Sequence, residues 1–338
     1  MSSSSDTTGP VLVTGGCGFL GFHVVQALLD DLSCGPITVV SRNPTTNIFD
    51  NVDYKACDIT DAVLVKRIVE EINPRVIIHI ASPRPMDVAL KQDDFEDSNI
   101  VGTRNLINSA RDCSSTEAFV FSSTVNVIQG KEHINVKEDY RPYWNPKSKE
   151  ALPYWRSKAE AEKIVLVANS GNLKTASLRL CMVIGLKEHA LVPAQLDALD
   201  QGKTNIQLGD NRNLLDTVSA ENAAHAHLLA MHALLDQRKL LGEIIWRTAG
   251  DKTELRDVRI IPSWAANAMA MAAEFANAFI FFSGKIPELN RHVVNFCTST
   301  YTYDISKARD VLGFNPTART EQVMKEATEW ELKRRAQS

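Results

Sequence analysis

The sequence lacks the cysteine spacings that a disulfide framework or a zinc site requires. Its 338 residues include six cysteines, and no two of them form a Cys-x-x-Cys pair. This scatter predicts free thiols in a reducing compartment and no structural metal. Residues 1–9 are polar and lack the apolar core of a signal peptide, so we expect a disordered lead-in to a cytoplasmic protein.

An excess of charge of one sign is lacking as well. The chain has 37 lysines and arginines against 41 aspartates and glutamates, a net charge of −4. This balance argues against nucleic acid or a strongly anionic membrane as a partner. The hydrophobic content of 44% is ordinary for a globular protein, and the length allows one large domain or two modest ones.

Long apolar runs are scarce, and the one that occurs, residues 260–282, is interrupted. Its polar residues fall at spacings of four, seven and three, on one face of a helix: Ser263, Asn267, Glu274 and Asn277. We therefore expect an amphipathic helix. Three interpretations stay open: a wall of the core or of a substrate pocket, which the pattern favours, a contact with a membrane surface, or a membrane span.

The first half of the chain alternates short apolar runs with helical stretches. This alternation predicts an α/β fold, a Rossmann-type doubly wound parallel sheet covered by helices on both faces. We expect strands at 11–14, 37–40, 52–57, 76–80, 118–122 and 175–178, and helices at 19–30, 62–72, 93–111 and 150–169. Ligands of such sheets bind at the carboxyl ends of the strands.

The second half is less regular and is predicted to be mostly helical. Helices are expected at 192–201 and 220–235, and two short ones within 304–335. We divide the chain into the lead-in, a dinucleotide-binding domain at 10–180 and a smaller substrate-binding region at 181–338. His225 and His227 are two residues apart and so diverge on a helix, which predicts packed or capping histidines rather than metal ligands.

A glycine-rich turn follows the first predicted strand. Gly16, Gly18 and Gly21 fit the spacing G-x-G-x-x-G, and Gly15 precedes them. The spacing permits a tight turn and a close approach of the backbone to a pyrophosphate, which the amino end of the next helix would attract. With a strand before it and a helix after it, the turn predicts a dinucleotide site.

Tyr154 and Lys158 stand four residues apart in a predicted helix, so their side chains share one face. An ammonium group near a phenol stabilises the phenolate, and we expect Lys158 to lower the pKa of Tyr154. A tyrosine of this kind can exchange a proton with a carbinol oxygen.

These motifs together resemble the extended short-chain dehydrogenases/reductases. Within them the chain resembles the 3β-hydroxysteroid dehydrogenase family, above all its sterol-4α-carboxylate 3-dehydrogenases. The motifs that carry the resemblance are TGGCGFLG (14–21), CDITD (57–61), NIVGT (99–103), FSST (121–124), YWRSK (154–158), GDNRNLLD (209–216), ENAAHAHLLA (221–230) and LGFNP (312–316).

The resemblance implies a catalytic set of Thr124, Tyr154 and Lys158. Tyr154 would be the general acid/base, Lys158 would bind the nicotinamide ribose, and Thr124 replaces the family's serine, with Ser123 as the alternative if the register is shifted by one. Asn99 resembles a structural asparagine. The implied cofactor-binding residues are Gly15, Gly18, Phe19, Leu20, Ser41, Arg42, Asp58, Ile59, Ala81, Ser82 and Leu180, together with Tyr154 and Lys158.

Two of these positions bear on the cofactor. Asp58 would accept a hydrogen bond from the adenine amine, or it could cap the helix that starts at Ala62. Ser41 stands where NAD-preferring relatives have an acid, and Arg42 could grip a 2′-phosphate. We therefore favour NADP(H), with NAD(H) as the alternative that the resemblance itself implies.

The expected function is the interconversion of a secondary alcohol and a ketone on a hydrophobic polycyclic substrate, steroid-like or terpenoid. Decarboxylation, double-bond isomerisation and a nucleotide-sugar epimerase or dehydratase stay open as alternatives. The region between residues 243 and 261 looks shorter than in the sterol enzymes, which leaves the substrate open. The resemblance also implies a homodimer through the helices at 93–111 and 150–169, and residues 260–282 leave open a peripheral contact with the endoplasmic reticulum membrane.

Overall fold

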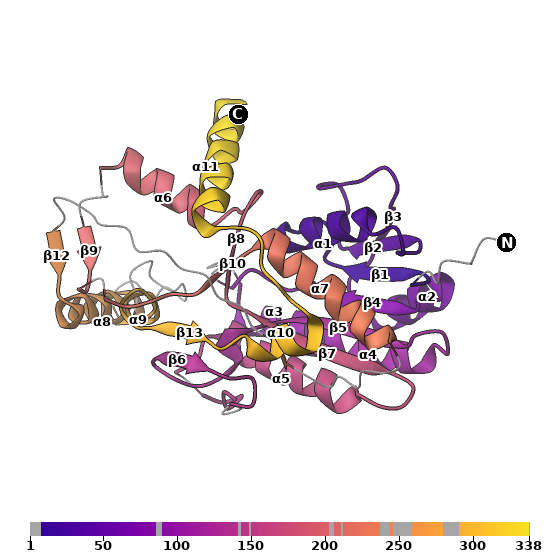
Figure 1. The fold of residues 1–338 in the computed structure, drawn as a ribbon. Helices are drawn as coiled ribbons and strands as arrows, with labels where there is room; N and C mark the ends of the chain where they lie inside the picture. Colours follow the sequence, from indigo (N-terminus) through magenta and orange to yellow (C-terminus); the bar gives the residue numbers. More distant parts are fainter. Residues whose placement is uncertain are drawn as a thin grey trace.

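A seven-stranded parallel sheet forms the centre of the computed structural model (Figure 1). The structure describes residues 8–85, 90–140, 143–148, 150–202, 206–210, 212–236, 244–245, 259–279 and 291–337. The strand order is β11-β7-β5-β4-β1-β2-β3. The strands β1, β2 and β3 follow one another toward one edge, and β4 and the later strands extend the sheet toward the other edge, so the topological switch point lies between β1 and β4. This order confirms the expected doubly wound α/β fold.

The strands are short and apolar, and most are buried on both faces, as parallel strands under two helix layers must be. The exception is β3, which lies at the sheet edge and is partly exposed. Their bounds are β1 Val11–Thr14, β2 Ile37–Ser41, β3 Asp53–Ala56, β4 Val76–His79, β5 Ala118–Thr124, β7 Lys174–Leu180 and β11 Ile244–Ile245.

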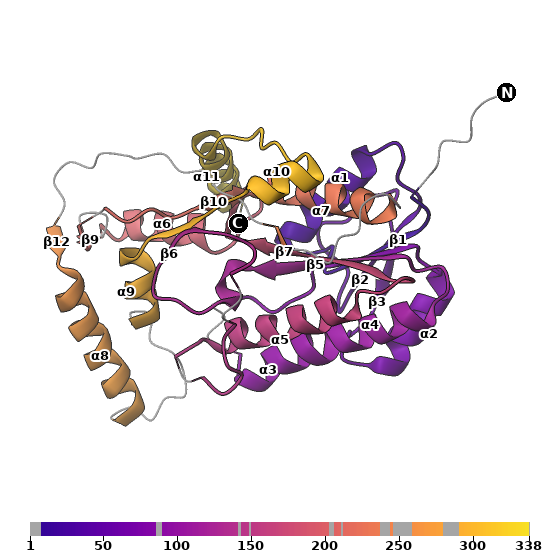
Figure 2. The same ribbon diagram turned by 60° about the horizontal axis from the view of Figure 1, so that its bottom comes forward.

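Helices cover both faces of the sheet (Figure 2). One face packs against α1 (Phe19–Asp30) and α7 (Ala220–Leu235). The other packs against α2 (Ala62–Ile72), α4 (Gly102–Asp112) and α5 (Pro153–Ala168). Because side chains alternate along a strand, Val11 and Val13 join the first core and Leu12 joins the second.

The predicted helix at 93–111 is interrupted by a π turn. It consists of α3 (Gln92–Glu96), the π segment η1 (Asp97–Val101) and α4. The Gly102 N–H donates to the Asp97 carbonyl, five residues back, instead of the four of an α-helix. Such turns often mark functional positions, and this one carries Asn99.

The remaining elements lie outside the sheet: β9, β12, α8 and α9 lie on the left of Figure 1, and α10 packs against α7. Three short parallel pairs form separate two-stranded sheets: β8 with β10, β9 with β12 and β6 with β13. The bounds are η2 Val125–Val127, β6 His133–Val136, β8 Met182–Ile184, α6 Leu191–Asp200, β9 Ile206–Leu208, β10 Thr217–Ser219, β12 Arg259–Ile261, α8 Ser263–Phe279, α9 Arg291–Thr298, β13 Tyr301–Tyr303, α10 Ser306–Leu312 and α11 Thr320–Gln337.

Several boundaries differ from the sequence expectation. The apolar run at 260–282 begins as a strand, β12, and becomes the helix α8 only after Pro262. Among the described residues, no helix is long and apolar enough to cross a membrane. The final helix, α11, spans 18 residues rather than a short stretch. The division of the chain at residue 180 stays a prediction, although the later elements α7 and β11 join the sheet layer.

Candidate active site

The glycine-rich turn lies at the carboxyl end of β1, beside the end of β4. Gly15 has φ +74°, and a Cβ atom there would lie 2.7 Å from the backbone nitrogen of Ala81. A Cβ atom on Gly21 would lie 2.1 Å from the Gly15 carbonyl oxygen. Gly18 caps α1 without a side-chain bond, so the amino end of this helix offers its N–H groups to a ligand. Phe19 and Leu20, also expected to bind the cofactor, are the first residues of α1 and are half-buried.

The end of β2 lies next to this turn, because the Gly15 N–H donates to the Val40 carbonyl at 3.0 Å and Ser41 is the last residue of β2. Arg42 follows and is exposed. The role of these two positions in binding a dinucleotide ribose stays a prediction.

Asp58 does not cap the following helix, so that alternative is wrong. The cap of α2 is Asp61, whose Oδ1 accepts from the Leu64 N–H at 3.0 Å. Asp58 Oδ1 instead accepts from the N–H and hydroxyl of Thr60, at 2.9 and 2.8 Å. Asp58 is exposed and its neighbour Ile59 is buried. A bond from an adenine amine to Asp58 stays a prediction.

Lys158 is buried on α5 and points at the end of β5. Its Nζ donates to the Ser122 carbonyl at 2.6 Å and lies 4.0 Å from the centre of the Phe121 ring. Burial lowers the pKa of Lys158 to about 7, and the nearby Glu162 carboxylate opposes this shift. Near neutral pH the group is therefore poised between its charged and neutral forms.

Tyr154 lies one turn before Lys158 and is half-buried, with its ring edge-on to Phe95. Burial raises the pKa of Tyr154. The expectation that Lys158 lowers this pKa is wrong for the structure, because the ammonium is bound to the Ser122 carbonyl and desolvation of the phenol prevails.

The two hydroxyl candidates end β5. By the alternation of the strand, Ser123 shares the α5 side with Phe121, and Thr124 faces the other way. Thr124 Oγ1 accepts from the Asn126 N–H at 3.3 Å and so starts the η2 turn. Ser123 Oγ is buried without a hydrogen-bond partner among the described residues. This geometry therefore favours Ser123, the alternative with the register shifted by one residue, as the hydroxyl of the catalytic set.

The ends of β4 and β7 complete the edge of the site. Ala81 and Ser82 follow β4 and are half-buried, and the Ser82 hydroxyl donates to Asn99 Oδ1 at 2.8 Å. Leu180 ends β7 and pairs with Thr124. Asn99 is buried, and its Nδ2 donates to Ser157 Oγ at 2.9 Å, so it connects the β4 loop with the helix of Tyr154.

A buried ion pair that sequence reasoning missed lies behind Lys158. Glu162 and Arg179 are both fully buried. Arg179 donates to Glu162 Oε1 at 2.7 Å from Nη2 and 3.0 Å from Nε, and to Oε2 at 3.2 Å from Nε. Tyr143 and Ser177 donate to the same carboxylate at 2.8 and 2.9 Å. A glutamate one turn after Lys158 was the signal that could have found it.

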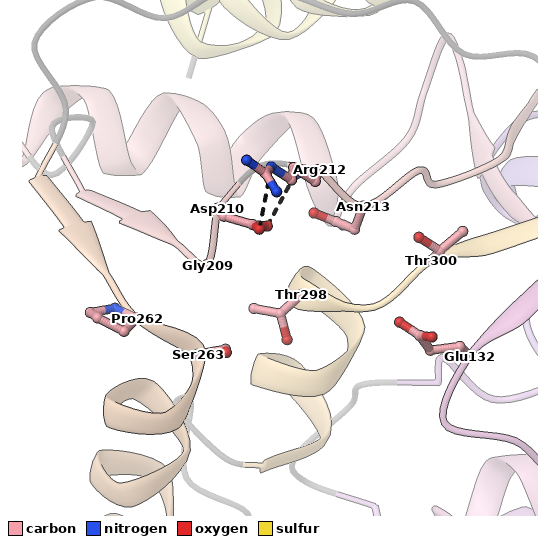
Figure 3. A pocket seen from close by; sticks show the side chains of 9 residues that line it. All are labelled: Glu132, Gly209, Asp210, Arg212, Asn213, Pro262, Ser263, Thr298 and Thr300. Atoms are coloured by element: carbon pink, nitrogen blue, oxygen red, sulfur yellow. Dashed lines mark hydrogen bonds and ion pairs between the residues drawn. The ribbon is translucent and has the colours of Figure 1, made fainter.

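An open depression, shown in Figure 3, is lined by other residues. It has a volume of about 520 Å³ and lies between the ends of β9 and β12 and the start of β13. Its lining is polar: Glu132, Gly209, Asp210, Arg212, Asn213, Pro262, Ser263, Thr298 and Thr300. It contains no residue of the catalytic set and therefore does not define the site.

The described residues contain no group of three or more histidine, cysteine or acidic side chains that could hold a metal. His227 is buried, with Nδ1 2.7 Å from the Ala223 carbonyl oxygen, and its pKa is lowered to about 4 by burial. His225 packs near the Phe314 ring.

Comparison with known proteins identifies the family. Residues 12–248 match the model of the 3-beta hydroxysteroid dehydrogenase/isomerase family. The sterol-4-alpha-carboxylate 3-dehydrogenase (decarboxylating) of Schizosaccharomyces pombe is 33% identical, covering 93% of this chain and 95% of its own. The chain belongs to the 3-beta hydroxysteroid dehydrogenase/isomerase family. This membership confirms the family recognised in the sequence and the class of enzyme, an oxidoreductase acting on CH–OH groups.

Other similarities agree with this family. The enzyme of the same name from Saccharomyces cerevisiae is 27% identical over 95% of this chain and 97% of its own. Among solved structures, a UDP-glucose 4-epimerase of Thermotoga maritima has a TM-score of 0.69 at 21% identity, covering 96% of this chain and 99% of its own. The enzyme WbmG of Bordetella bronchiseptica, in complex with NAD, has a TM-score of 0.69 at 16% identity, covering 96% and 94%. These structures share the fold.

The depressed pKa of Lys158 predicts a specific pH dependence of stability. Between its pKa of about 7 in the folded state and 10.5 in the unfolded state, only the unfolded chain carries the proton, so stability rises with pH across this window. Below pH 7 Lys158 is charged in both states, so the full free-energy cost of burying its ammonium group destabilises the fold. Lys158→Met should therefore stabilise the protein more at pH 6 than at pH 9, by roughly 1–3 kcal/mol.

Urea unfolding of wild type and variant at both pH values measures this difference. Lys66→Met, at a lysine whose side chain is 54% exposed, is the control and should show almost no such change. Identical pH slopes for wild type and Lys158→Met would show that the ammonium is not desolvated in the fold.

Proposed function

We propose that the protein is an NAD(P)-dependent dehydrogenase of the 3β-hydroxyl group of a sterol-like substrate, and that its substrates carry a 4α-carboxylate. The observation that carries the proposal is Tyr154 and Lys158 on one face of α5, at the strand ends that also hold the glycine-rich turn. The relatives named as decarboxylating sterol-4-alpha-carboxylate 3-dehydrogenases support the substrate class.

Tyr154 is the proton carrier of the proposed reaction. In the oxidative direction its phenolate takes the proton of the substrate hydroxyl, and in the reductive direction the phenol returns it. When bound, the nicotinamide ring accepts or supplies the hydride. Because burial raises the pKa of Tyr154, oxidation requires prior loss of the phenol proton, and we expect it to accelerate with rising pH.

The hydroxyl at the end of β5 holds the substrate oxygen. Ser123 and Thr124 are the candidates, and either can donate a hydrogen bond to a ketone oxygen. A carboxylate β to that ketone can leave as CO₂, since the electron pair passes to an enolate oxygen that the same hydroxyl and Tyr154 stabilise.

The epimerase alternative has support from fold alone. The UDP-glucose 4-epimerase is similar at 21% identity, whereas the sterol enzyme of S. pombe reaches 33% along nearly the whole chain. The family's name includes an isomerase, and double-bond isomerisation of the product is therefore the second activity to assay.

Removal of the Tyr154 hydroxyl tests the proposed chemistry. Tyr154→Phe keeps the ring against Phe95 but cannot carry a proton, so kcat for oxidation of a 4α-carboxysterol should fall about 10²-fold or more. Dinucleotide affinity, measured by isothermal titration, should stay within a few-fold. Tyr301→Phe, which removes a hydroxyl bonded to the Lys131 carbonyl, is the matched control. Activity of Tyr154→Phe within a few-fold of wild type would refute the assignment.

The cofactor that we propose is NADP(H). The proposal is supported by the absence of an acid at Ser41 and by the exposed Arg42 next to the turn. A charge-assisted contact between arginine and phosphate contributes roughly 1.5–3 kcal/mol. NAD(H) is the alternative, and the NAD complex of WbmG shows that this fold accommodates it.

The ratio of kcat/KM for the two cofactors tests this choice. Wild type should prefer NADP by about 10-fold or more, and Arg42→Ala should abolish the preference. Ser41→Asp combined with Arg42→Ala should reverse it, because an aspartate accepts from ribose hydroxyls and repels the phosphate. A wild-type preference for NAD would make Arg42 an ordinary solvated residue.

A homodimer is proposed through the outer faces of α4 and α5. These helices pack side by side on one face of the sheet (Figure 2) and leave Arg104, Asn108 and Val167 exposed, Val167 by 80%. A two-fold axis would place the two helix pairs together in a closed interface.

Light scattering across micromolar concentrations should show a dimer. Val167→Glu should shift it toward monomer, because the charge would be buried in the interface. Val63→Glu, at a valine that is 81% exposed on α2, is the control and should leave the dimer unchanged. A wild-type monomer throughout this range, or dissociation by both variants alike, would contradict the proposed interface.

Peripheral contact with a membrane, such as that of the endoplasmic reticulum, is proposed for α8. Trp264, Met271 and Phe275 are 75%, 55% and 60% exposed, and their spacings of seven and four put them on one face. This apolar face could insert at the level of lipid headgroups.

Flotation with phosphatidylcholine vesicles tests this contact. Wild type should float with the vesicles, and Trp264→Ser combined with Phe275→Ser should reduce the floating fraction several-fold. Leu32→Ser, at a leucine that is 97% exposed on another surface, is the control. A wild type that does not float with the vesicles would contradict the proposed membrane contact of α8.

A further inference from the structure

A buried polar row crosses the sheet beneath α4. The strand register places Thr14 opposite His79 and His79 opposite Phe121. Thr14 ends the strand that leads into the glycine-rich turn, and Thr103 of α4 lies above the row. Thr14 and Thr103 are fully buried and His79 is 1% exposed. The imidazole of His79 therefore lies between the dinucleotide turn and the helix layer.

Hydrogen bonds connect this row to the helix of Tyr154. Thr14 Oγ1 lies 2.7 Å from His79 Nδ1, and His79 Nε2 lies 2.9 Å from Thr103 Oγ1. Thr103 Oγ1 donates to the carbonyl of Asn99 at 2.5 Å. The Asn99 side chain then donates to Ser157 Oγ, which in turn donates to the Tyr154 carbonyl at 3.0 Å.

The surrounding donors fix the direction of these bonds. The backbone N–H groups of Ile80 and Ala81 donate to Thr14 Oγ1 at 3.2 and 3.3 Å, so the hydroxyl hydrogen of Thr14 is left for His79 Nδ1. Thr103 directs its own hydrogen to the Asn99 carbonyl and must accept from His79 Nε2. Only the neutral imidazole with its hydrogen on Nε2 satisfies both ends.

The environment of His79 keeps it neutral. Burial, together with the charge of Lys158, lowers the pKa of His79 well below its usual value. The rings of Phe119 and Phe121 lie 6.0 and 5.4 Å away. His227, a packed core histidine, differs from His79. Its Nδ1 bonds to the Ala223 carbonyl, and its Nε2 has no partner among the described residues.

We propose that His79 is a positioning residue of the reaction. Its Nε2–H imidazole joins the end of β1 to the π turn of Asn99, so that the dinucleotide turn and the start of α5 keep one relative position. The inference rests on the proposed role of Tyr154, because it is Tyr154 that the path of bonds positions. His79 itself transfers no proton.

Thr103 offers the sharpest test, because its hydroxyl can be removed at nearly constant shape. Thr103→Val should lower kcat for 4α-carboxysterol oxidation by between about 10-fold and 10²-fold, since misplacement of a catalytic group by less than 1 Å has such effects. The KM values for sterol and dinucleotide should change by less than about 3-fold. Thr103→Ser keeps the hydroxyl and should restore kcat.

The matched control is Thr175→Val. Thr175 is also fully buried, and its hydroxyl donates to the Val165 carbonyl of α5 at 3.0 Å and takes no part in the bonds of the row. The two valine variants should lose similar stability, yet only Thr103→Val should lose kcat. An unchanged kcat in Thr103→Val, an equal loss in Thr175→Val or a failure of Thr103→Ser to restore activity would each overturn the proposal.

Nuclear magnetic resonance of ¹⁵N-histidine protein tests the tautomer without any substrate. The two ring nitrogens of His79, identified by loss of their signals in His79→Gln, should show the Nε2–H form from pH 6 to pH 9. A hydrogen on Nδ1, or a charged ring, would overturn the bond direction on which the inference stands. Because this result needs no activity, it separates failure of the inference from failure of the proposed function.

Discussion

The parallel register of the central strands is the constraint on which the site depends. One row of the sheet places Val40, Thr14, His79, Phe121 and Ser177 side by side. Because side chains in one row of a parallel sheet point to the same face, all five face the layer of α4 and α5. Thr14 leads into the glycine-rich turn, Phe121 lies under Lys158, and Ser177 binds Glu162. The pairing of the strands alone thus aligns the groups that the chemistry needs.

The helix α5 carries three ionisable groups at intervals of one turn, and the protein handles each differently. Tyr154 is half-buried, Lys158 is buried against the sheet, and Glu162 is buried with Arg179. A buried ion pair rarely adds much stability, because desolvation offsets the attraction. Here the carboxylate also raises the pKa of Lys158 against burial, so the pair helps to keep a cation available where the site requires one.

Most of the fold was predictable from the sequence, because it rests on local patterns. The apolar runs, the glycine spacing and the Tyr-x-x-x-Lys pair each reflect a periodicity that the chain shows directly, and the predicted strands and helices of the first half lie within a few residues of their expected positions. The short strands β6 and β8 to β13 and the helix α9 were not predicted, because two or three paired residues leave no periodic pattern in the sequence. The π turn was not predictable, since it adds one residue to a turn without any change in the apolar pattern. The true cap of α2 was missed because Asp58 and Asp61 both precede the helix, and only geometry shows that Asp61 reaches Leu64.

The polar part of the site was harder to predict for a different reason. His79 stands in the apolar sequence Val-Ile-Ile-His, where a strand pattern gives it no role, and its partners Thr14 and Thr103 are 65 and 24 residues away. A buried imidazole without partners would destabilise the fold by the desolvation of its polar atoms. The sequence can tolerate a histidine there only because the register supplies a donating hydroxyl, that of Thr14, on one side and α4 supplies an accepting hydroxyl, that of Thr103, on the opposite side. The same bonds that make this histidine tolerable also tie α4, the π turn and α5 to the dinucleotide turn, so the stability of the core and the geometry of the site share one set of contacts.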